Sequence, residues 1–393
     1  MEIEPRVQFD DTSTAFSYKS DRQLRKANFI FTLVNNPAIS SVATTIAKIA
    51  LKLHLPFVRT IIRNTIFEHF CGGETISESD KTIATLKRFN VGTILDYSVE
   101  GAKTEEGFDE TTQEILRTIE KAKGNDALPF CVFKVTGMAD TPLLAKKNSG
   151  ETLTAEEQAA FTRIHDRVDA VCRKAFENDV HILVDAEETW IQDPIDHLSY
   201  EMMKKYNQQK AIVFNTFQMY RKDMTAHLRE AHEAAVKENY FLGVKLVRGA
   251  YMEKEAAYAE KNGYENPIHD SKEDTDKAFN KGLTFCVDHK EKISLMCGSH
   301  NDYSNKFLTV LIEKHGLKPN DPHIWFAQLL GMSDHISFNL SKAGYNVAKY
   351  VPYGPVSAVM PYLIRRAQEN TSVAGQSSRE LQLIRKELKR RRK

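Results

Sequence analysis

Eight short runs rich in β-branched and aromatic residues alternate with longer charged segments from about residue 91 onward. Segments such as 156–178, 195–209 and 222–238 have the charged, amphipathic pattern of helices. The predicted strands are 92–98, 130–136, 181–187, 211–217, 241–248, 293–298, 324–330 and 347–352. Eight strands, each followed by a helix, predict an α/β fold with a parallel (βα)8 barrel of the TIM type.

A doubly wound open sheet is the alternative fold for this alternation. Such a sheet normally carries a glycine-rich first turn, and neither GxGxxG nor GxxxxGK[ST] occurs in the sequence. The polar stretch 140–155 is long for a connection between a strand and a helix, and we interpret it as an insertion. The barrel is therefore favoured, as a domain of residues 91–370.

Two helical extensions are predicted to flank the barrel. Residues 1–90 form an N-terminal arm that includes an amphipathic helix at 39–53, which either packs onto the barrel or lies on a membrane surface. Residues 371–393 form a helical tail that ends in RKELKRRRK, with seven basic residues and one acidic residue. We expect this end either to be a frayed, solvated terminus or to contact anionic lipid.

Composition narrows the class of protein. The 393 residues are 41% hydrophobic and 27% charged, so the chain can bury a core, and a net charge of +1 argues against nucleic acid as the main partner. Five cysteines without a CxxC pattern favour a reducing compartment over a disulfide framework. Neither a signal peptide nor a spanning apolar segment is evident, which favours the cytoplasm. The 13 histidines include no HExxH motif, and no metal site is predicted.

Polar residues concentrate near the carboxyl ends of the predicted strands. Parallel strands are buried on both faces, so charges within them are unusual, and barrel enzymes build their active sites at these ends. The residues concerned are Asp96, Lys134, Asp185, Glu187, Gln218, Lys245, Arg248, His300 and Asn301. A single one could be a structural ion pair, but the set predicts an active site at the barrel mouth.

A second cluster follows the last strand, in the segment YLIRRAQE. Helical spacing places Tyr362, Arg365, Arg366 and Glu369 along one broad side of a helix. Paired arginines offer planar donors for a carboxylate or a phosphate, although a solvated helix face would show the same pattern. We expect a small anion at the barrel mouth between these arginines and Lys134, with Asp185 or Glu187 balancing the charge.

Several segments together resemble the proline dehydrogenase family, most closely its eukaryotic-type, monofunctional branch. They are FKVTGM (133–138), LVDAEE (183–188), NTFQMY (215–220), VKLVRGAY (244–251), GSHN (298–301), FAQLLGM (326–332) and YVPYGPVSAVMPYLIRRAQEN (350–370). The resemblance implies a distorted (βα)8 barrel that binds FAD. It also implies oxidation of L-proline to 1-pyrroline-5-carboxylate, by hydride transfer from proline C5 to flavin N5.

The resemblance also assigns roles to individual residues. Catalytic positions are Asp185 and Lys245, and proline-binding positions are Lys134, Leu329, Tyr350, Tyr362, Arg365 and Arg366. Flavin-binding positions are Ala186, Gln218, Val247, Arg248, Gly249, Ala250, Ser299, His300 and Glu369. Here the arginines and Lys134 hold the carboxylate, while Tyr350 and Leu329 form a wall against the pyrrolidine ring.

Three other functions stay open at this stage. The first is hydroxyproline dehydrogenase, an enzyme with closely similar chemistry. The second is a phosphate-binding barrel lyase or isomerase that uses Lys134 or Lys245 as a Schiff base. The third is a non-catalytic membrane-surface protein. For the favoured function the resemblance implies a membrane quinone as electron acceptor, while the basic tail 385–393 and the helix 39–53 are the features that point to peripheral membrane association. The expected location is then the cytoplasm at the inner membrane face, or the mitochondrion in a eukaryote.

Overall fold

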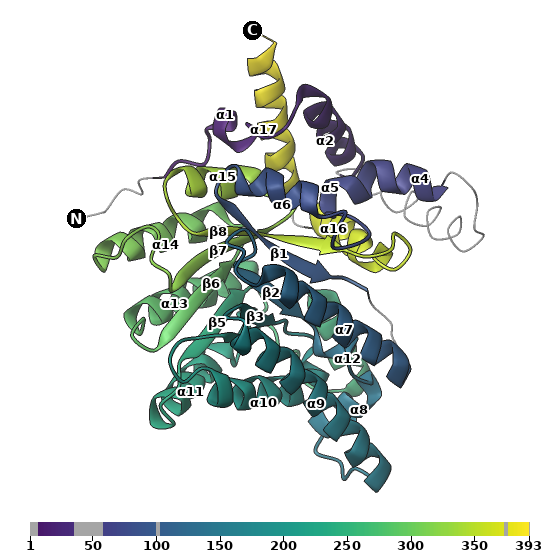
Figure 1. Cartoon of the computed structure of the whole chain (residues 1–393). Helices are drawn as coiled ribbons and strands as arrows, with labels where there is room; N and C mark the ends of the chain where they lie inside the picture. The colour runs from purple at the N-terminus through teal and green to yellow at the C-terminus, as the bar shows by residue number, and fades with distance from the viewer. Residues whose placement is uncertain (1–6, 35–57, 100–102, 373–375, 393) are drawn as a thin grey trace. The chain divides into compact units, whose positions relative to one another are not determined.

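The computed structural model describes residues 7–34, 58–99, 103–372 and 376–392. Its eight strands are β1 (Val91–Tyr97), β2 (Phe130–Phe133), β3 (His181–Val184), β4 (Val213–Gln218), β5 (Leu242–Val247), β6 (Ile293–Gly298), β7 (Ile324–Leu329) and β8 (Val347–Tyr353). They close into a barrel in chain order, from β1 through β8. All eight predicted strands and the predicted (βα)8 barrel are confirmed (Figure 1).

The described chain divides into two compact units, and the barrel strands divide with it. One unit contains residues 103–327, and the other combines residues before 100 with those from 328 onward. Parallel pairs run from β2 to β7 in the first unit, whereas β1 pairs with β8 in the second, from Val91 against Val347 to Tyr97 against Tyr353. The domain limits predicted near residues 90 and 370 stay predictions.

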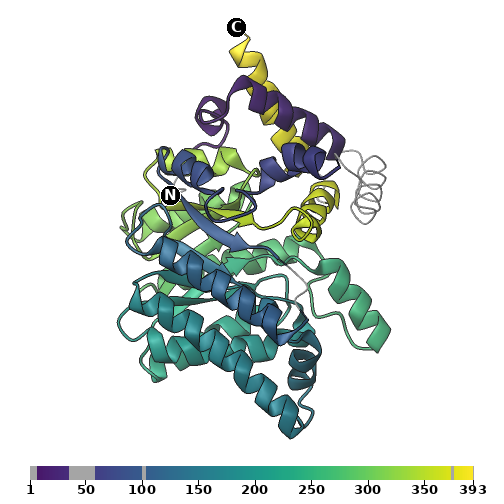
Figure 2. The same cartoon turned by 45° about the vertical axis from the view of Figure 1, so that its right-hand side comes forward.

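In the first unit, at least one helix follows each strand from β2 to β6, and the helices of this unit lie beside these strands (Figure 2). The helices are α7 (Glu105–Ala122), α8 (Thr141–Asn148), α9 (Ala155–Glu177), α10 (Thr189–Tyr206), α11 (Met224–Lys237), α12 (Met252–Asn262), α13 (Lys272–Asp288) and α14 (Asp302–Lys314). Half of the stretch interpreted as an insertion is helix α8, capped by the Asp140 side chain. Thr154 and Glu157 then form a capping box that begins α9.

In the second unit, short helices precede β1 and three helices lie after β7. They are α1 (Thr12–Ala15), α2 (Asp21–Val34), α4 (Val58–Ile62), a π-helical turn (Arg63–Phe67), α5 (Glu68–Phe70), α6 (Asp80–Lys87), α15 (Asp334–Lys342), α16 (Met360–Ser372) and α17 (Gln376–Arg391). Helix α17 packs against α1 and α2 (Figure 1). One apolar cluster joins these parts and includes Phe31, Met332, Tyr362, Leu363 and Ile384.

The basic end of the chain is helical and bonded to the protein over its described residues. Glu387 is fully buried and accepts hydrogen bonds from Arg390 and Arg391, while Arg391 also pairs with Asp21 at 2.9 Å. The frayed-terminus interpretation is therefore wrong for residues 376–391. The predicted helix 39–53 lies outside the described residues. Where the chain is described, none of its helices has the length and hydropathy to cross a membrane.

Candidate active site

The first unit brings together the two residues predicted to be catalytic. Asp185 directly follows β3, where its main-chain N–H donates to the Phe133 carbonyl at 2.9 Å. Lys245 lies within β5, is only 4% exposed, and forms an ion pair with the Asp185 carboxylate. A buried ammonium group in a strand needs such a partner, and the pair joins the end of β3 to β5, the strands on either side of β4.

Two residues after Asp185, Glu187 is buried and takes part in several hydrogen bonds. Its carboxylate accepts hydrogen bonds from the Thr136 main-chain N–H at 3.0 Å and from the Thr136 hydroxyl. Its main-chain carbonyl accepts from the Gln218 side-chain amide at 2.7 Å. Burial raises the pKa of Glu187 to about 7, although the charge of Lys134 and the bonds from Thr136 act in the opposite direction. Glu187 is therefore a carboxyl group that titrates near neutral pH.

Arg248 follows β5, and three neighbours hold its guanidinium group. It donates to the hydroxyls of Ser299 and Ser304, both at 2.9 Å, and to the Asp276 carboxylate at 2.6 Å. The group also lies 4.4 Å from the ring centroid of Phe279. Burial alone would raise the pKa of Asp276, but hydrogen bonds from Lys272 and Arg248 outweigh it and lower that pKa. The arginine is thus a fixed cation between the ends of β5 and β6.

The chain after Arg248 requires glycine. Gly249 has φ +140°, and a Cβ at this position would lie 2.5 Å from the ring of Tyr220. Tyr220 is held there because its main-chain N–H donates to the Arg248 carbonyl at 2.7 Å. Only glycine combines this backbone conformation with so close a ring. The Tyr220 ring therefore lies directly against the main chain at Gly249.

The second unit holds the residues predicted to form the wall against the substrate ring. Leu329 ends β7, and the N–H of the next residue, Leu330, donates to the Tyr350 carbonyl at 2.8 Å. Tyr350 lies within β8 and is buried, whereas Leu329 is half-buried and packs against the apolar cluster. The two predicted wall residues are therefore joined through the main chain.

Helix α16 carries the predicted arginine clamp. Tyr362 and Arg366 are buried, Arg365 is half-buried, and the Arg366 guanidinium lies 5.2 Å from the ring centroid of Tyr362. The helical spacing inferred from the sequence is confirmed. Glu369 belongs to the same helix, but its side chain lies outside the described part of the structure. The predicted proline ligands thus divide between the units, with Lys134 in the first and the arginines in the second.

Sequence reasoning missed one buried cation in this region, Lys349. It lies in β8 beside Tyr350, is 0% exposed, and pairs with Asp334 at 2.9 Å. The available signal was the lysine within the apolar run VAKYVP, which is as unusual as Lys134 or Lys245. The partners of Arg248 were also missed, because Asp276 and Ser304 lie on helices whose polar residues resemble any solvated face.

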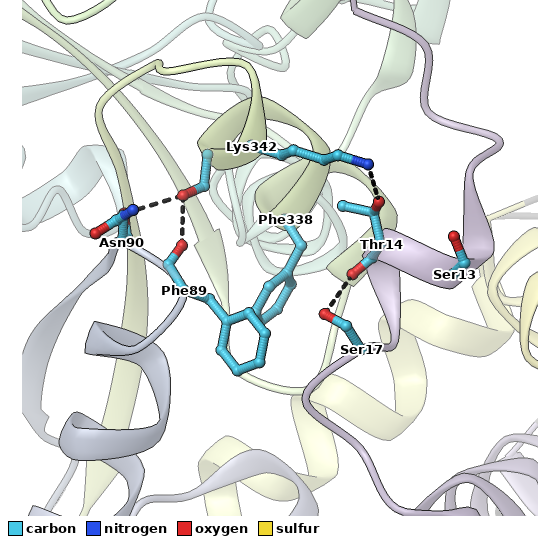
Figure 3. A pocket seen from close by; sticks show the side chains of 8 residues that line it. Ser13, Thr14, Ser17, Phe89, Asn90, Phe338 and Lys342 are labelled. Atoms are coloured by element: carbon cyan, nitrogen blue, oxygen red, sulfur yellow. Dashed lines mark hydrogen bonds between the residues drawn. The ribbon is translucent and has the colours of Figure 1, made fainter.

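A separate pocket of about 340 Å³ contains none of the predicted site residues (Figure 3). Its lining consists of Ser13, Thr14, Ser17, Phe89, Asn90, Phe338, Ser341 and Lys342. Lys342 extends over it and donates to the Thr14 hydroxyl at 2.8 Å. In the described ranges, no group of three or more histidine, cysteine, aspartate or glutamate side chains could hold a metal ion.

Comparison with known proteins identifies the family of this chain. The family model described as proline dehydrogenase matches residues 79–379. Proline dehydrogenase 1, mitochondrial, of Dictyostelium discoideum is 34% identical over 426 residues, covering 97% of this chain and 74% of that protein. The human protein of the same name is 43% identical over 253 residues, covering 64% of this chain and 41% of its own length.

Solved structures resemble the fold at much lower identity. A crystal structure of proline utilization A from Bdellovibrio bacteriovorus has a TM-score of 0.72 and 19% identity, covering 93% of this chain. The matched region is 38% of that longer chain, and at 19% identity the likeness concerns the fold alone. The family model and the Dictyostelium relative each extend over most of the sequence, and on that basis this chain belongs to the proline dehydrogenase family.

Proposed function

We propose that this protein oxidises L-proline to 1-pyrroline-5-carboxylate with FAD as its cofactor, the first step of proline catabolism. One observation carries the proposal: the family match over residues 79–379 includes every residue assigned here to the flavin and to proline. The ion pair between Asp185, directly after β3, and Lys245, within β5, supports the proposal, because barrel enzymes place charged residues toward the carboxyl ends of their strands.

The strand-end groups of the first unit fit a flavin dinucleotide. Lys245 and Arg248 supply positive charge, and Gln218 and Ser299 supply polar side chains. The residues that would hold FAD are Ala186, Gln218, Val247, Arg248, Gly249, Ala250, Ser299, His300 and Glu369. FAD, when bound, supplies the acceptor for the hydride that leaves proline C5.

The role of this chain is to bind and orient proline. Arg365, Arg366 and Lys134 would hold the carboxylate through charge-assisted hydrogen bonds, and the ring would lie against Tyr350 and Leu329. Loss of hydride from C5 needs the amine without its proton, because the nitrogen lone pair forms the C=N bond of the product. Three cations exceed the charge of one carboxylate, so Glu187 as an anion would balance the site.

The electron acceptor and location belong to the same proposal. We propose that a quinone reoxidises the enzyme and that the protein associates peripherally with a membrane. Relatives from Dictyostelium, Arabidopsis and human are named mitochondrial, which supports a mitochondrial location if the source is a eukaryote.

A visible spectrum of the purified protein tests the proposal. We expect flavin absorption that proline bleaches without oxygen and that a soluble quinone restores. The cyclic imine product is identified by mass spectrometry. A protein that binds FAD but is not bleached by proline would contradict the substrate assignment, and failure to bind any flavin would contradict the cofactor. Faster bleaching by trans-4-hydroxyproline than by proline would favour the hydroxyproline alternative.

A further inference from the structure

The turn between β7 and α15, residues 330–333, is held in an unusual backbone conformation. Gly331 has φ +77° and Ser333 has φ +51°, a left-handed conformation that is uncommon for a residue other than glycine. A Cβ at Gly331 would lie 2.4 Å from the His69 carbonyl. Such a conformation persists only where surrounding contacts determine it.

Lys349 stabilises the turn by donating hydrogen bonds to its main-chain carbonyl groups. Its ammonium group donates to the Met332 carbonyl at 2.6 Å and to the Leu329 carbonyl at 3.3 Å. The third bond goes to the Asp334 carboxylate at 2.9 Å, at the start of α15. Asp334 in turn accepts from the Tyr18 hydroxyl at 2.7 Å and pairs with Lys19 at 3.1 Å. The N-terminal arm thus contacts the turn through one buried carboxylate.

Glu380 stabilises the turn by accepting a hydrogen bond from one of its main-chain amide groups. This residue lies on α17, is buried, and accepts the Ser333 main-chain N–H at 3.0 Å. The same carboxylate lies 3.6 Å from His335 Nδ1. Met332 enters the apolar cluster that also contains Leu381 and Ile384 of α17. A helix from the end of the chain therefore fixes the one residue of the turn that has an unfavourable φ.

The turn is directly joined to the predicted wall of the substrate site. Leu329 immediately precedes it, and the Leu330 N–H donates to the Tyr350 carbonyl at 2.8 Å. Tyr350 is also the residue next to Lys349 in β8. A shift of the turn would therefore move the main chain of both wall residues.

We propose that Glu380 and Lys349 are positioning residues that set the fit of the substrate ring by fixing the turn between Leu329 and Asp334. Helix α17 is then part of the substrate-site support rather than a separate tail. Neither residue touches the substrate in this proposal, and each acts through the main chain of the wall. The inference rests on the proposed function for its kinetic consequence, but its structural part is independent of that function.

The test compares Glu380→Ala with Glu387→Ala in the full-length holoenzyme. Both changes remove a buried carboxylate from α17, but Glu387 bonds to Arg390 and Arg391 rather than to the turn. Hydrogen–deuterium exchange followed by mass spectrometry reports on the amides of 330–333 without any reference to activity. We expect faster exchange there in Glu380→Ala and wild-type exchange there in Glu387→Ala.

Kinetics give the second readout. We expect Glu380→Ala to raise KM for proline about fivefold with little change in kcat, the effect of losing one main-chain hydrogen bond. Glu380→Gln should restore KM, because its amide oxygen can still accept the Ser333 N–H. Glu387→Ala should lower the thermal midpoint and leave KM unchanged.

Lys349→Met is the second variant, in case Glu380→Ala does not fold. It removes the donors to the Leu329 and Met332 carbonyls, while Asp334 keeps Lys19 and Tyr18 as partners. The same faster exchange and raised KM are expected. Equal exchange of residues 330–333 in the Glu380 and Glu387 variants, or in Lys349→Met and wild type, would overturn the proposal. If the variants exchange as expected but the wild-type protein does not oxidise proline, the proposed function fails and the positioning of the turn stands.

Discussion

At the scale of single residues, the two arginines of α16 have the most direct predicted role. We expect Arg366→Met to raise KM for proline while flavin stays bound, because a charge-assisted bond to the carboxylate is lost. The expected loss of binding free energy is about 1.5–3 kcal/mol. Steady-state kinetics and the flavin spectrum measure both effects, with Arg365→Met as a parallel variant and Arg385→Ala on α17 as the control. A wild-type KM in both α16 variants would remove the arginines from the clamp.

Tyr350 is predicted to select proline over trans-4-hydroxyproline. Its large ring would lie against the pyrrolidine, and an added hydroxyl at C4 would need both space and a hydrogen-bond partner. Discrimination against one added hydroxyl in an apolar pocket is typically about 10²-fold. Tyr350→Ser should reduce it by opening space and supplying a small hydroxyl. The measurement is the ratio of kcat/KM for the two substrates, and an unchanged ratio in the variant would show that another residue selects.

At the scale of elements, the turn after β7 gives a stability prediction. Gly331→Ala should destabilise the protein more than Gly344→Ala, although both glycines have positive φ. The left-handed conformation alone costs about 1–2 kcal/mol for a residue with a Cβ. At Gly331 the new methyl group also meets the His69 carbonyl, whereas nothing lies within 4 Å at Gly344. Thermal midpoints of the two variants measure the difference, and equal midpoints would show that the turn adapts freely.

The sequence predicted the elements well because their signals are local. Each strand is a short apolar run, and the start of α9 is marked by the capping box of Thr154 and Glu157. The stretch 140–155, interpreted as an insertion, contains the helix α8, which its polar sequence did not reveal because polar residues on a short helix resemble those of a loop. Asp185 and Lys245 could be singled out from charge near strand ends, but their ion pair was not predicted and is seen only in the structure. The contacts that Lys349 and Glu380 make with the turn 330–333 could not be predicted, because they join residues that are far apart in the sequence.

At the scale of the whole molecule, Glu187 makes stability depend on pH. Burial raises its pKa from 4.5 to about 7, so between these values the unfolded chain has released a proton that the folded chain still holds. Stability therefore decreases as pH rises through this range, by up to about 3 kcal/mol for this group alone. Below pH 4.5 both states are protonated and the penalty is absent.

Glu187→Gln should remove that dependence. We expect the variant to gain thermal stability relative to wild type as pH rises from 5 to 8, with the apo forms compared so that cofactor binding does not contribute. Glu230→Gln on α11, an exposed carboxyl, is the control and should follow wild type. A constant difference in midpoint between Glu187→Gln and wild type would show that Glu187 does not titrate in this range.

The contacts around residues 330–333 also constrain the order of events during synthesis. The turn bonds to β8 through Lys349 and to α17 through Glu380, and Asp334 beside it bonds to Tyr18. A nascent chain that has left the ribosome only as far as β7 contains the N-terminal arm, but it still lacks Lys349 of β8 and Glu380 of α17. The strands can pair as they emerge, yet the turn reaches its final conformation only after α17 has left the ribosome. Substrate recognition would therefore be among the last properties that the growing chain acquires.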